Sequence, residues 1–208
     1  MVTEWARIEG FTPGSGDVNI YRNTDRQGLW IGILDNKPIG CIAGIRYNSS
    51  YGFIGLFIVL EKYRGNGYGL KLWKHAMKYL SNLPCIGLEA APNRLEDYSK
   101  WGFRKSSITT RWEWQGNDGF PVDKLYFEDN LDDYNVVKAK SVSSEQVQIY
   151  DASREPSPRP HFLSDWLDNT TGNVLVISDQ KGICHGFGRI RPCLLNKGDG
   201  WRIGPLLA

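Results

Sequence analysis

Residues 64 to 69 read Arg-Gly-Asn-Gly-Tyr-Gly, a composition typical of a loop that binds a phosphate group. They stand between an apolar run at 53–60 and a helix-forming run at 70–80. A strand that leads through glycines into a helix presents unpaired backbone N–H groups at the positive end of the helix dipole. Glycine has no Cβ, so the backbone can approach an anion closely. The chemistry that this pattern favours is binding of a phosphate or pyrophosphate.

Two common nucleotide loops do not fit this segment. The dinucleotide fingerprint G-x-G-x-x-G fails because, counted from Gly67, its last glycine position holds Leu72. The P-loop pattern fails because no lysine followed by serine or threonine comes after the glycines. What remains is R-x-x-G-x-G, made by Arg64, Gly67 and Gly69.

The surrounding pattern predicts the elements that position this loop. Alternating and apolar runs predict strands at 29–34, 38–47, 51–60, 85–91 and 103–114. Helical spacing of apolar residues predicts helices at 2–9, 18–22, 69–80 and 94–101, with Gly102 after the last of them. In the helix at 69–80, we expect Leu70, Trp73, Ala76, Met77 and Leu80 to form the buried face. This order of elements predicts a mixed α/β layer fold.

Together with the strand before it and the amphipathic helix after it, the R-x-x-G-x-G segment resembles the acyl-CoA pyrophosphate loop of the GNAT superfamily of N-acetyltransferases. The resemblance implies an α/β (α+β) fold, with a mixed, mostly antiparallel sheet flanked by helices. This chain departs from the family pattern because the first strand and most of the first helix are missing. Either the chain starts late, or another segment fills that edge of the sheet.

The second half of the chain resembles the second unit of certain bacterial two-domain GNAT proteins. A Gly/Pro-rich break at 116–121 separates an acetyl-CoA-binding domain at 1–117 from a partial GNAT-like unit at 122–208. The resemblance rests on Pro158-Arg159, on Gly-x-Gly-Arg-x-Arg-Pro at 186–192 and on Arg-Ile-Gly-Pro-Leu at 202–206. The family's second unit is longer, so we expect half a domain with an open sheet edge. Arg189 and Arg191 suggest either tight packing or a basic patch at an anion.

Local patterns in this second half predict its elements as well. We expect a strand at 135–142, a helix at 145–151 capped by Ser143 or Ser144, and a hairpin formed by 173–178 and 183–190. Phe162, Leu163 and Trp166 share a helical face. The glycine loop occurs only once, so a single cofactor site is expected.

The resemblance implies acetyl-CoA (coenzyme A) as the cofactor and assigns its contacts. The strand before the loop would polarise the acyl carbonyl with a backbone N–H and pair with the pantetheine arm. The residues that this implies are Phe57, Ile58 and Val59 on the strand, and Arg64, Gly65, Asn66, Gly67, Tyr68 and Gly69 in the loop.

Two residues are candidates for proton transfer. Tyr98 lies in Tyr-Ser-Lys-Trp-Gly-Phe, which resembles the family's Y-x-x-x-G-F element, where the tyrosine can protonate the departing thiolate. The other interpretation is that Tyr98 only packs in the core. A lysine-like amine costs about 4–5 kcal/mol to deprotonate at pH 7, so a carboxylate base would help. Glu89, on the strand after the cofactor helix, is the first candidate and Glu61 the second, and a surface role for Glu89 stays open.

We therefore predict an acetyl-CoA-dependent N-acetyltransferase that acts on a small-molecule or peptide amine. The alternatives are a non-catalytic acyl-CoA-binding or sensing module and a purely structural fragment. The acceptor cannot be deduced, and homodimer formation is left open.

Composition excludes several other classes. A net charge of +2 gives no general attraction to nucleic acid or membrane, and the longest apolar run is far shorter than a membrane span. Four cysteines are too few for a disulfide scaffold, and no signal peptide is evident, so we expect a cytoplasmic protein. Cys184, His185 and Cys193 lack the spacing and the fourth ligand of a zinc site, so no metal is expected.

Overall fold

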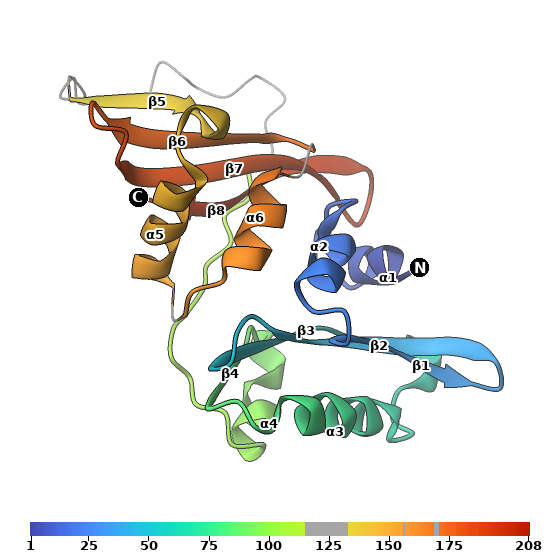
Figure 1. Cartoon of the computed structure of the whole chain (residues 1–208). Helices are drawn as coiled ribbons and strands as arrows, with labels where there is room; N and C mark the ends of the chain where they lie inside the picture. The colour runs from blue at the N-terminus through green and yellow to red at the C-terminus, as the bar shows by residue number, and fades with distance from the viewer. Residues whose placement is uncertain (115–132, 156, 169–170) are drawn as a thin grey trace. The chain divides into compact units, whose positions relative to one another are not determined.

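The computed structural model describes residues 1–114, 133–155, 157–168 and 171–208. By their contacts the residues group into two compact parts, Met1–Leu88 with Asp133–Ala208, and Glu89–Asp132. The domain boundary expected between residues 117 and 122 lies outside the described residues. The larger part contains two four-stranded sheets (Figure 1).

The first sheet has the strand order β1-β2-β3-β4. Its strands are β1 (Leu29–Leu34), β2 (Lys37–Arg46), β3 (Tyr51–Val59) and β4 (Cys85–Leu88). The first three are antiparallel and β4 runs parallel to β3, which confirms the expected mixed, mostly antiparallel sheet. Asp35 and Asn36 form the β1–β2 turn with φ of 48° and 59°, a conformation that these residue types tolerate.

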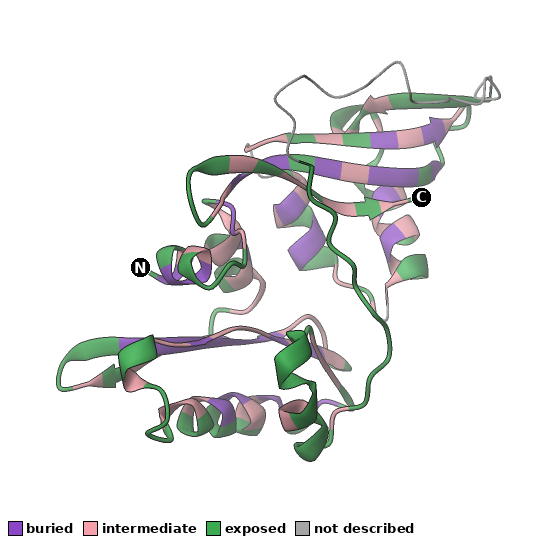
Figure 2. Cartoon of the chain, turned by 180° about the vertical axis from the view of Figure 1, so that it is seen from behind, coloured by how far each residue is buried: buried purple, intermediate pink, exposed green. Residues whose placement is uncertain are grey.

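Helices cover both faces of this sheet. On one face lies α1 (Val2–Ile8), and α2 (Asp17–Thr24) is the next helix along the chain. From α1, Val2, Trp5 and Ala6 form a buried cluster with Cys41 and Ile58 of the sheet. On the other face lies α3 (Tyr68–Leu80), which begins within a residue of its predicted start. Figure 2 shows the resulting buried residues concentrated in the middle of the sheet.

Glycines in β2 and β3 allow α3 to approach the sheet closely. A Cβ at Gly44 would lie 3.3 Å from a Leu80 methyl, and one at Gly52 would lie 3.1 Å from the other. Leu80 is fully buried, whereas Leu70, which we expected on the same face, is 44% exposed. Leu70 lies in the first turn of α3.

This packing predicts a large difference between two leucines of one helix. We expect Leu80→Ala to lower the free energy of unfolding by about 2–5 kcal/mol, because it leaves a cavity between α3 and the glycines. Leu70→Ala is the matched control and should cost less than about 1 kcal/mol. Urea unfolding of both variants measures the difference, and equal losses would contradict the described packing.

The second sheet is antiparallel throughout, in the order β5-β6-β7-β8. Its strands are β5 (Tyr134–Lys138), β6 (Asn173–Asp179), β7 (Cys184–Leu194) and β8 (Asp199–Leu207). A short 3-10 turn (Ala139–Ser141) leads from β5 to α5 (Ser144–Arg154), which is followed by α6 (Pro160–Asp168). The predicted cap is confirmed, since the Ser143 hydroxyl accepts the Glu145 N–H at 3.3 Å. The sequence did not predict β8 because glycines and a proline interrupt its apolar pattern.

Val147, Leu163 and Val176 are fully buried in the core that α5 and α6 form against this sheet. Phe162 and Trp166 are also buried, and they stack on each other with ring centroids 5.6 Å apart. The helical face expected at these positions is therefore confirmed.

Arg189 and Arg191 of β7 are buried and are bonded within the protein. Arg189 donates to the Trp166 and Thr171 carbonyls at 2.6 Å each, so its charge lies at the C-terminal end of α6, where a cation is favoured. Arg191 donates to the Asp17 carboxylate at 2.8 Å. Both guanidinium groups lie within 5 Å of the Trp166 ring centroid, and burial lowers the pKa of each. The burial of both side chains agrees with the interpretation as tight packing, and a contact with an anion stays a prediction.

The smaller part contains a 3-10 turn (Pro92–Arg94) and α4 (Leu95–Lys100), followed by Gly102 with φ of 91°. This confirms the predicted short helix and its terminal glycine. The strand expected at 103–114 is wrong, because these residues have no regular secondary structure. A strand is stabilised by hydrogen bonds to a neighbouring strand, and neither sheet of the described residues includes this segment.

Candidate cofactor site

Near its C-terminal end, β3 has one edge that is not paired with a described strand. β4 pairs with Tyr51–Ile54 only, while β3 continues to Val59. The Leu60 N–H donates to the Ile39 carbonyl on β2 at 2.9 Å. Because polar groups alternate along a strand, the backbone of Val59 faces the opposite side, away from β2. Among the described strands none pairs there, so an extended ligand could use that edge.

A β-bulge interrupts β3 next to this opening. Between the pairs Cys41↔Ile58 and Ala43↔Gly55, two residues of β3 face a single residue of β2. Leu56, one of the two, has a φ of 46°, and its carbonyl accepts the Cys41 thiol at 3.2 Å. Burial raises the pKa of Cys41 to about 12, so the thiol keeps its proton and can donate. Bulges of this kind redirect backbone polar groups.

The glycine loop follows β3 through a 3-10 turn (Glu61–Tyr63) and leads directly into α3. Gly65 and Gly67 have φ of 79° and 77°, in the left-handed region that favours glycine. The first α-helical bond joins the Lys71 N–H to the Gly67 carbonyl, and no side chain caps the helix. The preceding N–H groups of α3 therefore lack an intrahelical acceptor. A Cβ at either glycine would meet nothing within 4 Å, so space for an anion lies above the loop.

Arg64 and Asn66 hold the loop in shape. The Arg64 Nε donates to the Val59 carbonyl at 2.7 Å, and its guanidinium pairs with the Glu9 carboxylate. The Asn66 side chain donates to the Arg64 carbonyl at 3.0 Å. Glu9 was not anticipated from the sequence, since its pairing depends on how the segment after α1 folds back. Direct contact of Arg64 with a cofactor stays a prediction.

The structure places Glu89 and Tyr98 in the smaller part of the chain. Glu89 is exposed and comes immediately after β4, which ends earlier than the predicted strand. Tyr98 lies on α4, half-buried, with edge-on contacts to the Trp101 and Phe103 rings at 5.8 and 6.2 Å. Burial raises the pKa of Tyr98, so the phenol is protonated at neutral pH. The catalytic roles of Glu89 and Tyr98 stay predictions.

The described residues contain no cluster of three or more His, Cys, Asp or Glu side chains that could hold a metal ion. All four cysteines are free thiols, and only Cys85 is exposed. No helix in the described ranges is long and apolar enough to cross a membrane.

The structure is that of an α/β protein in which a bulged strand with an open C-terminal edge leads through a glycine loop to an uncapped helix N-terminus. Residues 2–103 match a family model described as "Acetyltransferase (GNAT) family". Residues 147–208 match a second model, described as "Acetyltransferase (GNAT) domain". The chain therefore belongs to the GNAT acetyltransferase family and contains two units of that kind.

The chain is also similar to individual proteins and solved structures. Holothin acyltransferase of Pseudoalteromonas sp. (strain SANK 73390) is 28% identical over 206 residues, which covers 99% of this chain and 65% of the relative. An uncharacterized protein of Caenorhabditis elegans is 32% identical over 66 residues, covering 32% of this chain and 21% of that protein. The crystal structure of "A Putative Acetyltransferase" from Pyrococcus horikoshii has a TM-score of 0.68 at 18% identity, covering this chain fully and 66% of that chain. The chain thus spans about two thirds of the two relatives that match it along its length.

Proposed function

We propose that this protein transfers an acetyl group from acetyl-CoA to a primary amine. The observation that carries the proposal is the continuous arrangement of the open edge of β3, its bulge and the uncapped N-terminus of α3. These provide a row of backbone polar groups for an extended arm and a cluster of N–H groups for a pyrophosphate. Membership in the GNAT family and similarity to an acyltransferase support acyl transfer. Acetyl-CoA and the amine acceptor are the specific part of the proposal.

In this proposal the backbone of the protein orients and polarises the thioester. N–H groups of Gly67, Tyr68 and Gly69 would bind the pyrophosphate, and the edge at Phe57–Val59 would pair with the pantetheine amides. A backbone N–H on that edge would hydrogen-bond the acyl oxygen and stabilise the charge that develops on it. These contacts need no particular side chain, which explains why buried strand residues can occupy functional positions.

Proton transfer would complete the reaction. The amine nitrogen forms a bond to the acyl carbon, the carbon–sulfur bond breaks, and the amine loses a proton while the thiolate gains one. Glu89 is the proposed base, and Tyr98 the proposed acid that protonates the sulfur. Because burial raises the pKa of Tyr98, its proton is lost only above the ordinary value near 10. Donation should therefore persist through alkaline assay conditions.

Substitution of Tyr98 tests the catalytic part of this proposal. We expect Tyr98→Phe to lower kcat by about 10²–10⁴-fold and to leave acetyl-CoA affinity within about twofold, because only the proton donor is removed. Free thiol release with a panel of primary amines measures kcat, and calorimetry measures affinity. Tyr134→Phe, on exposed β5, is the matched control.

The outcomes separate the rival functions. Full activity of Tyr98→Phe would exclude this residue as the acid while leaving acyl transfer intact. Saturable acetyl-CoA binding without thiol release on the whole panel would favour a binding or sensing module. Absence of any acetyl-CoA binding would overturn the proposed function.

A further inference from the structure

A buried cysteine of the neighbouring strand holds the bulge in β3. Cys41 on β2 is fully buried, and its thiol donates to the Leu56 carbonyl at 3.2 Å. Leu56 has a φ of 46°, in the left-handed region that a residue with a branched side chain adopts only where its surroundings enforce it. The hydrogen bond from Cys41 therefore stabilises a backbone conformation that Leu56 does not favour by itself.

This hydrogen bond fixes the direction of one backbone N–H group. The peptide bond between Leu56 and Phe57 is trans and planar, so its carbonyl and its N–H point in opposite directions. The Leu56 carbonyl points toward Cys41 on β2. The Phe57 N–H therefore points away from β2, toward the edge of β3 where none of the described strands pairs beyond Ile54.

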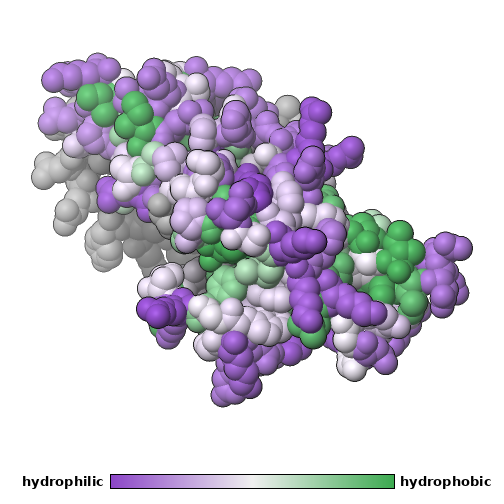
Figure 3. Space-filling view, turned by 60° about the horizontal axis from the view of Figure 1, so that its bottom comes forward, coloured by the Kyte–Doolittle hydropathy of each residue, from purple (hydrophilic) through white to green (hydrophobic). Residues whose placement is uncertain are grey.

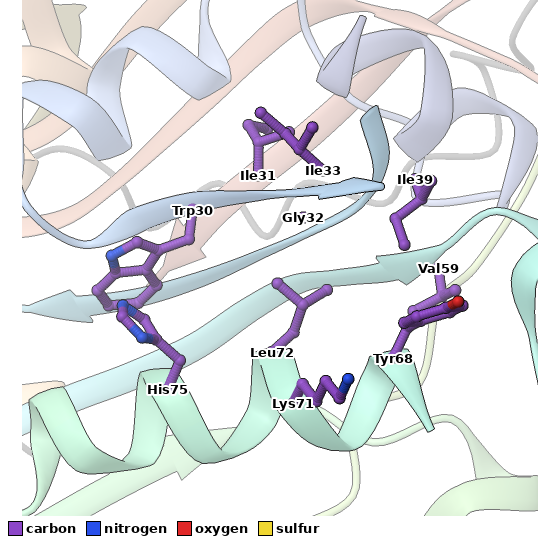
Figure 4. A pocket seen from close by; sticks show the side chains of 10 residues that line it. All are labelled: Trp30, Ile31, Gly32, Ile33, Ile39, Val59, Tyr68, Lys71, Leu72 and His75. Atoms are coloured by element: carbon purple, nitrogen blue, oxygen red, sulfur yellow. The ribbon is translucent and has the colours of Figure 1, made fainter. Parts of the chain in front are cut away.

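The same edge of β3 leads to the start of α3. Val59, two residues after Phe57, presents its backbone on the same side of the strand. Both side chains lie against the helix, since a Cβ at Gly69 would meet atoms of Phe57 and Val59 at 3.5 Å. Figure 4 shows Val59 next to Tyr68, at one end of a pocket of about 310 Å³ that both residues line. An acyl-CoA with its pyrophosphate at the glycine loop would therefore extend along this edge, past Val59 toward Phe57.

Cys41 itself lies on the face of the sheet away from α3. Its side chain belongs to the buried cluster that Val2, Trp5 and Ala6 of α1 form with the sheet. The lysines of α3 are exposed on the opposite face, and Figure 3, turned toward that helix, shows hydrophilic side chains at the surface there. The thiol is therefore enclosed by protein, and it can influence a ligand only through the backbone of β3.

We propose that Cys41 is a positioning residue of the acyl-transfer site, whose thiol directs the Phe57 N–H toward the oxygen of the acyl carbonyl and polarises it. Hydrogen bonds that follow one another in a chain strengthen each other, so the bond from the thiol to Leu56 strengthens the bond from Phe57 to the acyl oxygen. The gain is largest when negative charge develops on that oxygen, as the amine adds to the carbonyl carbon. This inference rests on the proposed acyl transfer and assigns to it a residue that does not touch the ligand.

Substitutions of Cys41 in the intact chain separate the hydrogen bond from the packing. Cys41→Val keeps an apolar side chain without a donor, whereas Cys41→Ser keeps a donor. We expect Cys41→Val to lower kcat for thiol release about tenfold or more and to leave acetyl-CoA affinity within about twofold, while Cys41→Ser keeps kcat within about threefold of the parent. Cys41→Ala removes the donor without adding volume, so it replaces Cys41→Val in the comparison should that variant fold poorly.

Cys184→Val is the matched control. Cys184 is a buried cysteine of the second sheet, and its thiol donates to the Gly186 carbonyl at 3.6 Å. The substitution removes the same kind of hydrogen bond away from the proposed site. It should leave kcat and acetyl-CoA affinity as they are in the parent.

Acetyl-CoA labelled with carbon-13 at the acetyl carbonyl measures the polarisation directly. When it binds to the parent, its carbonyl resonance should move downfield from the free value. The displacement should be smaller in Cys41→Val and restored in Cys41→Ser. Equal kcat and equal carbonyl shifts in the parent and Cys41→Val would overturn the role of Cys41 and leave acyl transfer intact, and so would a lower kcat in all Cys41 variants with an unchanged carbonyl shift. A parent that neither binds acetyl-CoA nor releases thiol would instead overturn the proposed function, and this inference with it.

Discussion

Replacing Gly67 by glutamate is expected to lower the affinity for acetyl-CoA by about 100-fold or more. Gly67 is the N-cap of α3, with φ of 77°, and open space lies over it. A glutamate there would bring a carboxylate to the N–H groups that we assign to the pyrophosphate. Two like charges about 4 Å apart near a protein surface repel by roughly 4 kcal/mol, more than the 2.7 kcal/mol that corresponds to 100-fold. Calorimetric titration with acetyl-CoA measures the loss.

Gly182→Glu is the matched control for this variant. Gly182 lies in the turn before β7 with φ of 78° and likewise has nothing within 4 Å of its Cβ position. Both variants place the same side chain in a left-handed conformation, which costs about 1–2 kcal/mol of stability in each. Acetyl-CoA affinity should fall in Gly67→Glu alone. If both variants bind acetyl-CoA as the parent does, the loop at 64–69 is not the pyrophosphate site.

Local patterns predicted most of the fold because the determining interactions lie within a few residues of each other. The loop at 64–69 and the cap at Ser143 depend on glycine conformations or short polar side chains, and both were found. The strand expected at 103–114 failed for the opposite reason. A half-buried strand needs alternating polar and apolar residues, which this segment has. It also needs a neighbouring strand, which comes from a part of the chain far away in sequence.

The parts of the site that the sequence did not predict depend on long-range contacts. The opening of β3 follows from how short β4 is, and the bulge at Leu56 follows from the register with β2. The pairing of Arg64 with Glu9 joins residues that the fold of α1 brings together. Lys71 and His75 line a pocket because the fold places β1 beside α3. The spacing of residues along the chain does not predict which of these distant segments come into contact.

The buried ion pair between Asp17 and Arg191 should be the most sensitive site for stability. Arg191→Met is expected to lower the free energy of unfolding by about 3–5 kcal/mol, because it leaves Asp17 without its cation. The side chains are 15% and 4% exposed, so water compensates little. The variant should also loosen the segment before α2, where the Gly14 N–H donates to Asp17 at 2.9 Å and the Leu194 N–H donates to the Pro13 carbonyl at 2.9 Å. Thermal unfolding should drop by roughly 6–20 °C.

A double-mutant cycle shows whether the charge or the packing causes this loss. Asp17→Asn with Arg191→Met removes both charges, so the double variant should be more stable than the sum of the two single losses predicts, by more than about 1 kcal/mol. Arg7→Met breaks an exposed pair with Glu4 and should cost less than about 1 kcal/mol. Strict additivity in the cycle would mean that Arg191 stabilises the fold through its stacking on Trp166, 4.9 Å away, and not through Asp17. The paired charges would then contribute little to holding the N-terminal segment against β7.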